Sequence, residues 1–384
     1  MRNSPLIPEY ELILLLARGT VSPPLQERAR SLLSKPLDWD GIVNRVAVEE
    51  VYPLFYRNLR NLGFDGVPAH GRKRIRDLAK INALQSTLLG EELARLLKIL
   101  SAAGIPTIPL KGGVLAEALY GDPTLRASAD IDILVPRRAV ARAFDLMLAG
   151  GYESEFGTGF FADLLLQNDI EYALTREDRG FSYLLELHWG VLWGGQNEEN
   201  ITEDLWAEAY SGTMLGAPAY GLSSEWQLLF LAAHAARHQW QGLKWLVDIH
   251  ELISTSGIDW DRVVEKAGRL GWEELLRLTF LACHALFATP VPPRFLQGTL
   301  PSWLILYPAF SSASWRDAFF ATRLLKLRSE KLRQIARVLF TPTLAECRLL
   351  RLPAFLGPLY YPLRPLRLGC KWGRSLAHFV HAAR

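Results

Sequence analysis

Two aspartates separated by one residue are the side chains of this sequence best placed to do chemistry. Asp130 and Asp132 lie in the segment 129–135, which is otherwise apolar and rich in β-branched residues. Because successive side chains of a strand point to opposite faces, both carboxylates leave one face, and Ile131 and Ile133 leave the other. Neighbouring carboxylates repel each other unless a cation lies between them, and oxygen ligands at this spacing suit Mg²⁺. The pair therefore predicts half of a metal site; the alternative is the solvated face of an antiparallel sheet.

The segment before the aspartates supplies groups that suit phosphate. Gly112 and Gly113 follow a predicted strand and precede a predicted short helix. Unhindered N–H groups at a helix N-terminus bind anions, so this turn is a candidate phosphate cradle. Lys111 and Arg126 are the nearby cations that would offset the charge developed in phosphoryl transfer.

A third carboxylate is needed for the second ion of many two-metal sites. In the segment 185–189, strand alternation places Glu186 and His188 on one face and the leucines on the other. Glu186 completes the ligand set if its strand lies beside that of Asp130. Glu171 on the preceding predicted strand is the competing candidate, and we favour Glu186 because its strand is longer and more apolar.

Hydrophobic spacing predicts the elements that position these residues. An amphipathic helix is expected over 77–100, ended by Gly104, within a helical region that begins the chain. Its apolar positions are Leu78, Ile81, Leu84, Leu88, Leu96 and Leu100. The predicted strands are 105–110, 131–135, 169–174 and 181–189, and the predicted helices beyond residue 110 are 114–120, 137–150, 225–238 and 244–254. The polar segment 175–180 predicts the loop of a hairpin.

Size and composition bound the class of protein. The 384 residues are 49% hydrophobic, which is ample for a buried core and excludes a disordered chain. The apolar run 12–17 is too short to cross a bilayer and follows acidic residues, so we expect a cytoplasmic protein without a transmembrane segment. Cys283, Cys347 and Cys370 lack the spacing of a disulfide framework or a zinc site, and we expect buried thiols.

The C-terminal stretch is strongly basic, although the net charge of the chain is only +3. From Arg323 to Arg384 there are 13 Lys and Arg residues and two Glu residues. Such a stretch attracts RNA or an anionic surface. We favour the alternative of a solvated basic face, because the arginines are spread among leucines and prolines.

A second group of residues with metal-binding side chains follows the predicted strands. His234 and His238 stand four residues apart on a predicted helix, and Asp248 comes ten residues later. As metal ligands they would form a separate site, but packing or capping at the helix edge is the favoured interpretation. Trp240 and Trp245 are assigned to the core, with stacking on a base as the alternative.

The order of these motifs resembles the DNA polymerase β-like nucleotidyltransferase superfamily, and more closely the bacterial family of uncharacterised nucleotidyltransferases. The motifs that carry the resemblance are 110–113, Arg126 with 130–135, 186–189 and 244–248. The resemblance extends over about 39–252 and does not cover the basic tail.

The resemblance implies a role for each candidate residue. The implied ligands of two Mg²⁺ ions are Asp130, Asp132 and Glu186, with Glu186 on the ion that activates the acceptor. The implied contacts with the nucleotide are Lys111, Gly112, Gly113, Arg126 and Lys244. Lys244 would belong to a helical region that closes over the nucleotide.

The implied fold class is α+β, with a small mixed β-sheet nucleotidyltransferase core flanked by N-terminal and C-terminal helical regions. We expect a helical N-terminal region over 1–100 and the core with its metal site over 101–200. A helical domain that closes over the nucleotide is expected over 201–310, and a basic helical C-terminal tail over 311–384.

The expected activity is Mg²⁺-dependent transfer of an NMP group from an NTP, with ATP expected, to an acceptor hydroxyl, with release of pyrophosphate. The alternatives are a kinase that uses the same two-metal site for γ-phosphoryl transfer and a non-catalytic nucleotide- or RNA-binding protein. The acceptor stays open among a peptide, a protein, a small molecule and RNA. The sequence has no Gly-x-x-x-x-Gly-Lys-Ser/Thr loop and no Gly-x-Ser-x-Gly elbow, which disfavours a P-loop ATPase and an elbow-type hydrolase.

Overall fold

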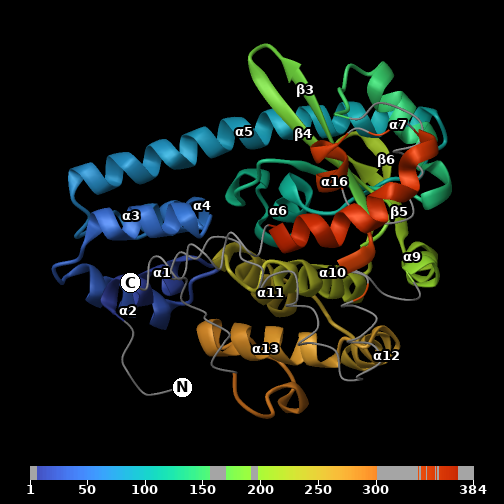
Figure 1. The fold of residues 1–384 in the computed structure, drawn as a ribbon. Coiled ribbons are helices and arrows are strands. Elements are labelled where there is room, and N and C mark those ends of the chain that lie inside the picture. The colour runs from blue at the N-terminus through green and yellow to red at the C-terminus, as the bar shows by residue number, and fades with distance from the viewer. Residues whose placement is uncertain are drawn as a thin grey trace.

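A four-stranded mixed sheet carries most of the residues singled out above, and helices lie on both sides of it (Figure 1). The computed structural model describes residues 7–155, 170–191, 198–300, 336, 339–342, 344–350, 352 and 354–370. Within them a second sheet of two strands accompanies the first. The predicted α+β class, with a small mixed sheet between helical regions, is confirmed.

The predicted helical region at the start of the chain is confirmed. It consists of α1 (Pro8–Leu16), α2 (Pro23–Leu33), α3 (Trp39–Val48), α4 (Tyr52–Asn61) and the 34-residue α5 (Ala69–Ala102). Gly104 follows α5 with a φ of 68°, a left-handed conformation that suits glycine after a helix end. The long α5 runs along the top of the molecule in Figure 1 and reaches from the N-terminal helices to the sheet.

The apolar face predicted for α5 is wrong at two positions. Ile81 and Leu84 are each 64% exposed, whereas Leu96 and Leu100 are fully buried as predicted. At the level of the first pair the inward position is taken by Asn82, whose side chain donates a hydrogen bond of 2.7 Å to the Thr124 carbonyl. A polar residue with a tertiary partner therefore replaces the apolar stripe there.

The main sheet has the strand order β1-β2-β4-β3. Its strands are β1 (Ile108–Pro109), β2 (Ile131–Leu134), β3 (Glu171–Asp178) and β4 (Phe181–His188). β2 runs parallel to β4 with Asp132 opposite Glu186, and β3 runs antiparallel to β4 with Glu171 opposite His188. The condition under which Glu186 completes the ligand set, that its strand lies beside β2, is therefore met. The greater length expected for the strand of Glu186 is wrong, because β3 and β4 both have eight residues.

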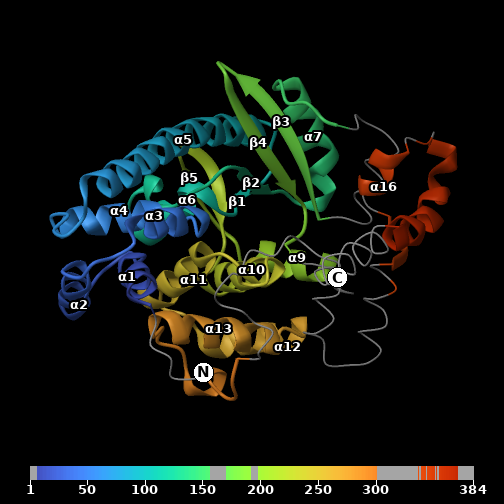
Figure 2. The same cartoon turned by 60° about the vertical axis from the view of Figure 1, so that its left-hand side comes forward.

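The two faces of the sheet belong to different cores, which fixes where the carboxylates point. Ile131 and Ile133 pack with α5 and α7 (Val140–Ala149), together with Leu185 and Leu187 of β4. Figure 2 shows α5 above β1 and β2, and α10 (Ser224–Arg237) and α11 (Leu243–Thr255) below them. Asp132 leaves the face opposite the isoleucines, as the alternation predicts.

The hairpin of β3 and β4 is tighter than predicted. Strand pairing continues through 175–178, which were predicted as loop, and the turn is Arg179-Gly180 with φ values of 50° and 79°. Two consecutive left-handed residues match the twist of the flanking strands in a two-residue hairpin. Residue 169, the predicted start of the first strand, lies outside the described residues.

Gly180→Ala is expected to lower the free energy of unfolding by about 1 kcal/mol, because an L-residue is strained in the left-handed region. A Cβ at Gly180 meets no atom within 4 Å, so the backbone alone sets this cost. Gly90→Ala, in the middle of α5 with equally open surroundings, is the matched control and is expected to stabilise by about 0.5–1 kcal/mol. Urea unfolding measures both, and equal effects of the two substitutions would contradict the turn.

The remaining elements lie between the strands or after them. Those around the core are α6 (Gly112–Tyr120), η1 (Pro123–Leu125), η2 (Arg137–Ala139), α9 (Glu198–Ala207) and the hairpin of β5 (Tyr210–Met214) and β6 (Ala217–Gly221). The later elements are α12 (Trp260–Leu270), α13 (Glu273–Phe287), η3 (Pro293–Phe295), α16 (Leu344–Leu349) and η5 (Ala354–Leu359), with a further helical stretch over 360–370. The predicted helices at 114–120, 137–150, 225–238 and 244–254 correspond to α6, η2 with α7, α10 and α11.

The basic tail is described only in part, from residue 336 with gaps to residue 370. Its described arginines include Arg348, which pairs with Glu155, and Arg364 and Arg367, which both pair with Glu346. These pairs neutralise part of the predicted basic face.

The cysteine prediction is right at two positions of three. Cys283 and Cys347 are buried, but Cys370 is exposed. Cys370 ends a helical stretch that presents several exposed residues, which the sequence spacing did not reveal. Among the described residues, no helix has the length and apolar character needed to cross a membrane.

Candidate functional site

Three side chains with metal-binding atoms meet on one face of β2 and β4. The ligand atoms of Asp132, Glu186 and His188 all lie within 4.8 Å of one another. His188 Nε2 is 3.2 Å from Asp132 Oδ1 and 3.6 Å from Glu186 Oε2. The parallel register places Asp132 opposite Glu186, and the alternation along β4 brings His188 to the same face. Two carboxylates and an imidazole are donors that suit a divalent metal ion.

Asp130 lies just before β2 and outside this group of three. Its carboxylate is half-buried, 3.5 Å from Ser128 Oγ. Burial, and then the negative charge of Asp132, raise the pKa of Asp130 above its usual value. The two carboxylates are therefore close enough to repel each other, although only Asp132 belongs to the strand.

Lys111 contacts Asp132 directly. Its Nζ is 2.8 Å from Asp132 Oδ1, and the two side chains are only 7% and 0% exposed. Lys111 caps the N-terminus of α6, whose first two residues are Gly112 and Gly113. Gly112 has a φ of 72°, and a Cβ there would lie 3.6 Å from Ser128 Oγ. The start of α6 is therefore beside the aspartates, where the phosphate cradle was predicted.

The two oxygens of Asp132 have different surroundings. Burial would raise the pKa of Asp132, but the positive charge of Lys111 and the hydrogen bond with His188 hold it far below its usual value. Oδ1 contacts both cationic partners, whereas the buried Oδ2 has no hydrogen-bond partner among the described residues. A buried carboxylate oxygen normally has a partner, so Oδ2 is suited to a ligand that the described residues do not supply.

His188 lies between three carboxylates. Burial lowers its pKa, but the bonds with Asp132 and Glu186 and the charge of Glu171 outweigh burial and raise the pKa to about 9. Nδ1 is 3.3 Å from Glu171 Oε2, and Arg237 binds both oxygens of Glu171 at 2.5 and 2.9 Å. Glu171, the competing third carboxylate, therefore contacts the ring nitrogen of His188 that Asp132 and Glu186 do not contact. It lies outside the group of three.

Glu186 is the most open of the three grouped side chains, 26% exposed. Its bond with His188 lowers its pKa, but burial and the neighbouring Asp132 charge outweigh that bond and raise the pKa above the usual value. A carboxylate with a raised pKa accepts a proton more readily than an exposed one.

Arg126 is buried against Asp248. Its Nε is 2.8 Å from Asp248 Oδ2, and both side chains are almost fully buried. The Tyr120 hydroxyl donates a hydrogen bond of 2.7 Å to Asp248 Oδ1. Asp248, considered above as a metal ligand with the two histidines, is thus the counterion of Arg126.

Lys244 reaches the core from the first turn of α11. Its Nζ is 2.7 Å from Glu50 Oε2 and 3.3 Å from the Ala127 carbonyl. The positive charge of Lys244 acts on Asp130, where it lowers the pKa against the effect of burial. The helical region after the sheet therefore brings a cation close enough to Asp130 to affect its pKa.

His234 and His238 pack on an aromatic side chain. The His238 ring stacks on Trp245 with centroids 4.3 Å apart, and the His234 ring meets Trp245 edge-on at 5.4 Å. Burial, followed by neighbouring positive charges, lowers the pKa of His238 to about 4 and also lowers that of His234. Across the described parts of the chain, neither histidine belongs to a group of three metal-binding side chains. Trp240 is buried in the core, as predicted.

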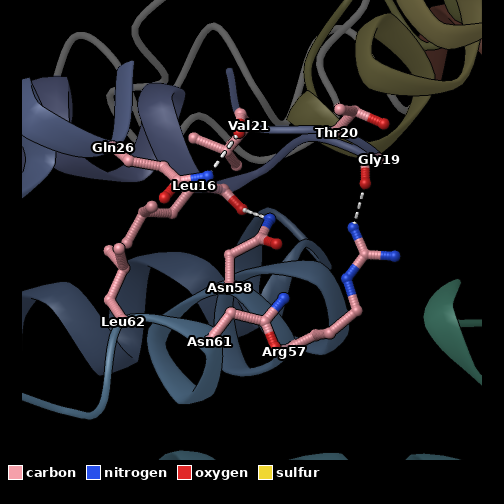
Figure 3. Close-up of a pocket in the computed structure, with 9 residues that line it drawn as sticks. All are labelled: Leu16, Gly19, Thr20, Val21, Gln26, Arg57, Asn58, Asn61 and Leu62. Atoms are coloured by element: carbon pink, nitrogen blue, oxygen red, sulfur yellow. Dashed lines mark hydrogen bonds between the residues drawn. The ribbon is translucent and has the colours of Figure 1, made fainter. Parts of the chain in front are cut away.

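A cavity of about 300 Å³ lies apart from these residues, between the segment that follows α1 and the helix α4 (Figure 3). Its lining residues are Leu16, Gly19, Thr20, Val21, Gln26, Arg57, Asn58, Asn61 and Leu62. Asn58 donates to the Leu16 carbonyl and Arg57 to the Gly19 carbonyl, so both polar side chains tie down the segment after α1. None of the candidate ligands or cations lines this cavity.

Two functional features were missed by sequence reasoning. His188 was placed on the correct face of the sheet but was given no role. The signal that could have found it is its position two residues after Glu186, which puts both side chains on the face with the candidate ligands. Arg237 was not considered, because its partner Glu171 is 66 residues away and no local pattern connects them.

Comparison with known proteins gives one match. A family model described as an uncharacterised nucleotidyltransferase matches residues 35–288. This range contains all the candidate ligands and cations and ends before the basic tail, which confirms the resemblance expected from the motifs. No curated protein and no solved structure matches the chain.

Proposed function

Because the chain belongs to the family of uncharacterised nucleotidyltransferases, we propose that it transfers the NMP group of an NTP, with ATP expected, to an acceptor hydroxyl. Pyrophosphate is the other product. The observation that carries the proposal is the buried Asp132 carboxylate, with one oxygen on Lys111 and the other without a partner among the described residues, beside Glu186.

The metal ligands in this proposal are Asp132 and Glu186, with Asp130 at the edge of the group. The fit rests on Asp132 Oδ2, which has no hydrogen-bond partner among the described residues, and on the grouping of its carboxylate with that of Glu186 and the imidazole of His188. Burial, and then the negative charge of Asp132, raise the pKa of Asp130, and the same two effects outweigh the bond with His188 and raise the pKa of Glu186. Two Mg²⁺ ions, when bound, would activate the acceptor hydroxyl and offset charge on the transferred phosphoryl group. Glu186 is the base that helps to take the acceptor proton.

The groups that bind the triphosphate are the N-terminus of α6 and the cations around it. Gly112 and Gly113 offer backbone N–H groups there, and Lys111 lies at the same turn. Lys244 on α11 and Arg126 are the other two cations of the proposed nucleotide site, and each already has a counterion, Glu50 for Lys244 and Asp248 for Arg126. Both therefore offset less phosphate charge than an unpaired cation would.

These contacts support the following division into domains, which is part of the proposal. Residues 101–200 form the core, 1–100 support it, and 201–310 close over the nucleotide through α11 and its Lys244. The tail over 311–384 is a solvated basic face, part of whose charge is paired with Glu155 and Glu346, and contact with RNA or an anionic surface is the alternative.

Labelled ATP tests the reaction. The protein is incubated with cell extract and Mg²⁺, and with ATP labelled at either the α or the γ phosphate. We expect transfer of the α label to an acceptor and release of the γ label in pyrophosphate. Transfer of the γ label alone would assign a kinase, and no transfer would favour a binding protein. Protease or nuclease treatment of the labelled product then assigns the acceptor class.

A further inference from the structure

We propose that His188 is itself a metal ligand, so that Asp132, Glu186 and His188 form a mixed nitrogen–oxygen site that prefers a first-row transition ion such as Mn²⁺ to Mg²⁺. The inference deepens the proposed function and rests on it in one respect, namely that Asp132 and Glu186 bind the metal. It identifies the class of ion and the residues that orient the imidazole.

The first support is the spacing of the three ligand atoms. Two ligands held at about 2.1 Å from one ion stand roughly 3.0–3.4 Å apart when the angle between them is right or tetrahedral. His188 Nε2 lies 3.2 Å from Asp132 Oδ1 and 3.6 Å from Glu186 Oε2. These two separations are close to the distances between neighbouring ligands of one metal ion, and the third, between Asp132 and Glu186, is at most 4.8 Å.

The second support is a buried carboxylate oxygen that has no hydrogen-bond partner among the described residues. It is Asp132 Oδ2, on a side chain that is 0% exposed. Such an atom is rare in a folded protein, because a buried polar atom normally has a partner or a ligand. Its position in the group with Glu186 and His188 points to a bound cation there.

The third support is the set of residues that contact the second ring nitrogen of His188, Nδ1. Histidines that bind metals almost always present their other ring nitrogen to a carboxylate or carbonyl, which fixes the ring and its tautomer. His188 Nδ1 lies 3.3 Å from Glu171 Oε2, and Arg237 holds Glu171 through both oxygens. Glu171 and Arg237 are therefore positioning residues for a metal-binding His188.

The charge around the site favours a divalent cation. A histidine must be neutral to bind a metal ion. With His188 neutral, the carboxylates around the site outnumber the cations that pair with them. The carboxylates are Asp130, Asp132, Glu171 and Glu186, and the cations that pair with them are Lys111 and Arg237. Arg126 and Lys244 have their own counterions in Asp248 and Glu50. The unbalanced negative charge lies around the grouped ligand atoms.

The donor set decides the class of ion. Mg²⁺ prefers oxygen ligands and keeps several waters, whereas imidazole nitrogen suits transition ions. Two carboxylates and one imidazole therefore bind Mn²⁺ more tightly than Mg²⁺, and Mn²⁺ is the probe because its binding is read by electron paramagnetic resonance.

The test measures Mn²⁺ binding to the full chain in the absence of NTP and acceptor. We expect bound Mn²⁺ to show electron spin-echo modulation from a directly bound ¹⁴N, and we expect Mg²⁺ to displace it only at 10-fold or greater excess. In His188→Gln the ¹⁴N signal is expected to disappear and Mn²⁺ affinity to fall at least 10-fold, with Mg²⁺ affinity little changed. Glu171→Gln keeps the ligand and is expected to weaken Mn²⁺ binding about 10-fold while the ¹⁴N signal stays.

His70→Gln is the matched control, because His70 is an exposed residue on α5 and is expected to leave Mn²⁺ binding unchanged. Bound Mn²⁺ without a ¹⁴N signal in the natural chain, a signal that survives His188→Gln, or equal affinity for Mg²⁺ would overturn the inference. The ¹⁴N signal of Mn²⁺ bound to the natural chain, together with its displacement by Mg²⁺, tests the inference even if a variant fails to fold. Since no nucleotide is present, failure of α-label transfer with an intact ¹⁴N signal would overturn the proposed function alone.

Discussion

Asp132→Asn is expected to lower the rate of NMP transfer by at least about 10³-fold, because the carboxylate supplies several kcal/mol of charge stabilisation through the metal it would hold. The substitution keeps the shape of the side chain and removes its charge. It also removes the anion that Lys111 and His188 share at Oδ1. The initial rate of label transfer from α-labelled ATP measures the loss.

The matched control is Glu155→Gln, which makes the same change from acid to amide at an exposed ion pair with Arg348. Exposed pairs contribute little, so this variant is expected to keep its rate within about twofold. Circular dichroism of both variants checks that the fold is retained. An Asp132→Asn protein that is folded and as active as the Glu155→Gln control would sink the assignment of the site.

The ligand face could be predicted from sequence because it depends on strand alternation alone. Isoleucines on one side of β2 and leucines on one side of β4 leave Asp132, Glu186 and His188 no choice of face once the strands are buried. Their approach to one another depends further on the parallel pairing of β2 with β4, which the motif order indicated only through the family resemblance.

Strand ends were less predictable, since hydrogen-bond partners and not side chains decide them. The run 105–110 is apolar, yet β1 keeps only Ile108 and Pro109 and lies at the edge of the sheet, where proline is tolerated. The run 175–178 is polar, yet it belongs to β3. β3 is also an edge strand, and edge strands commonly carry charged side chains. There Arg176 bonds to the buried Glu92, a contact that no local pattern foretells.

The partners of the cations could not be predicted at all. Lys111 and Arg126 were assigned to phosphate from their types and positions, and the structure places both on carboxylates. The contact between Arg126 and Asp248 spans 122 residues. Pairs of this kind follow from how helices pack on the sheet, which hydrophobic spacing specifies only as a face.

Asp248→Asn is expected to lower the free energy of unfolding by about 3–5 kcal/mol, because it leaves the Arg126 guanidinium buried without a counterion. The two side chains are only 3% and 1% exposed, so water cannot replace the lost charge. The amide oxygen of Asn still accepts the Tyr120 hydroxyl, which confines the change to the ion pair. Urea unfolding of the full chain measures the difference.

The same substitution in an Arg126→Met background is the control for this prediction. Without the guanidinium there is no stranded charge, so Asp248→Asn is then expected to cost about 1 kcal/mol or less, and the double variant to recover stability relative to Asp248→Asn. Equal costs in the two backgrounds would show that Asp248 acts through Tyr120 and not through Arg126. The expected coupling would mean that α11 is fixed to the core by this ion pair, and that Lys244 on the same helix is thereby held near Ala127 and Asp130.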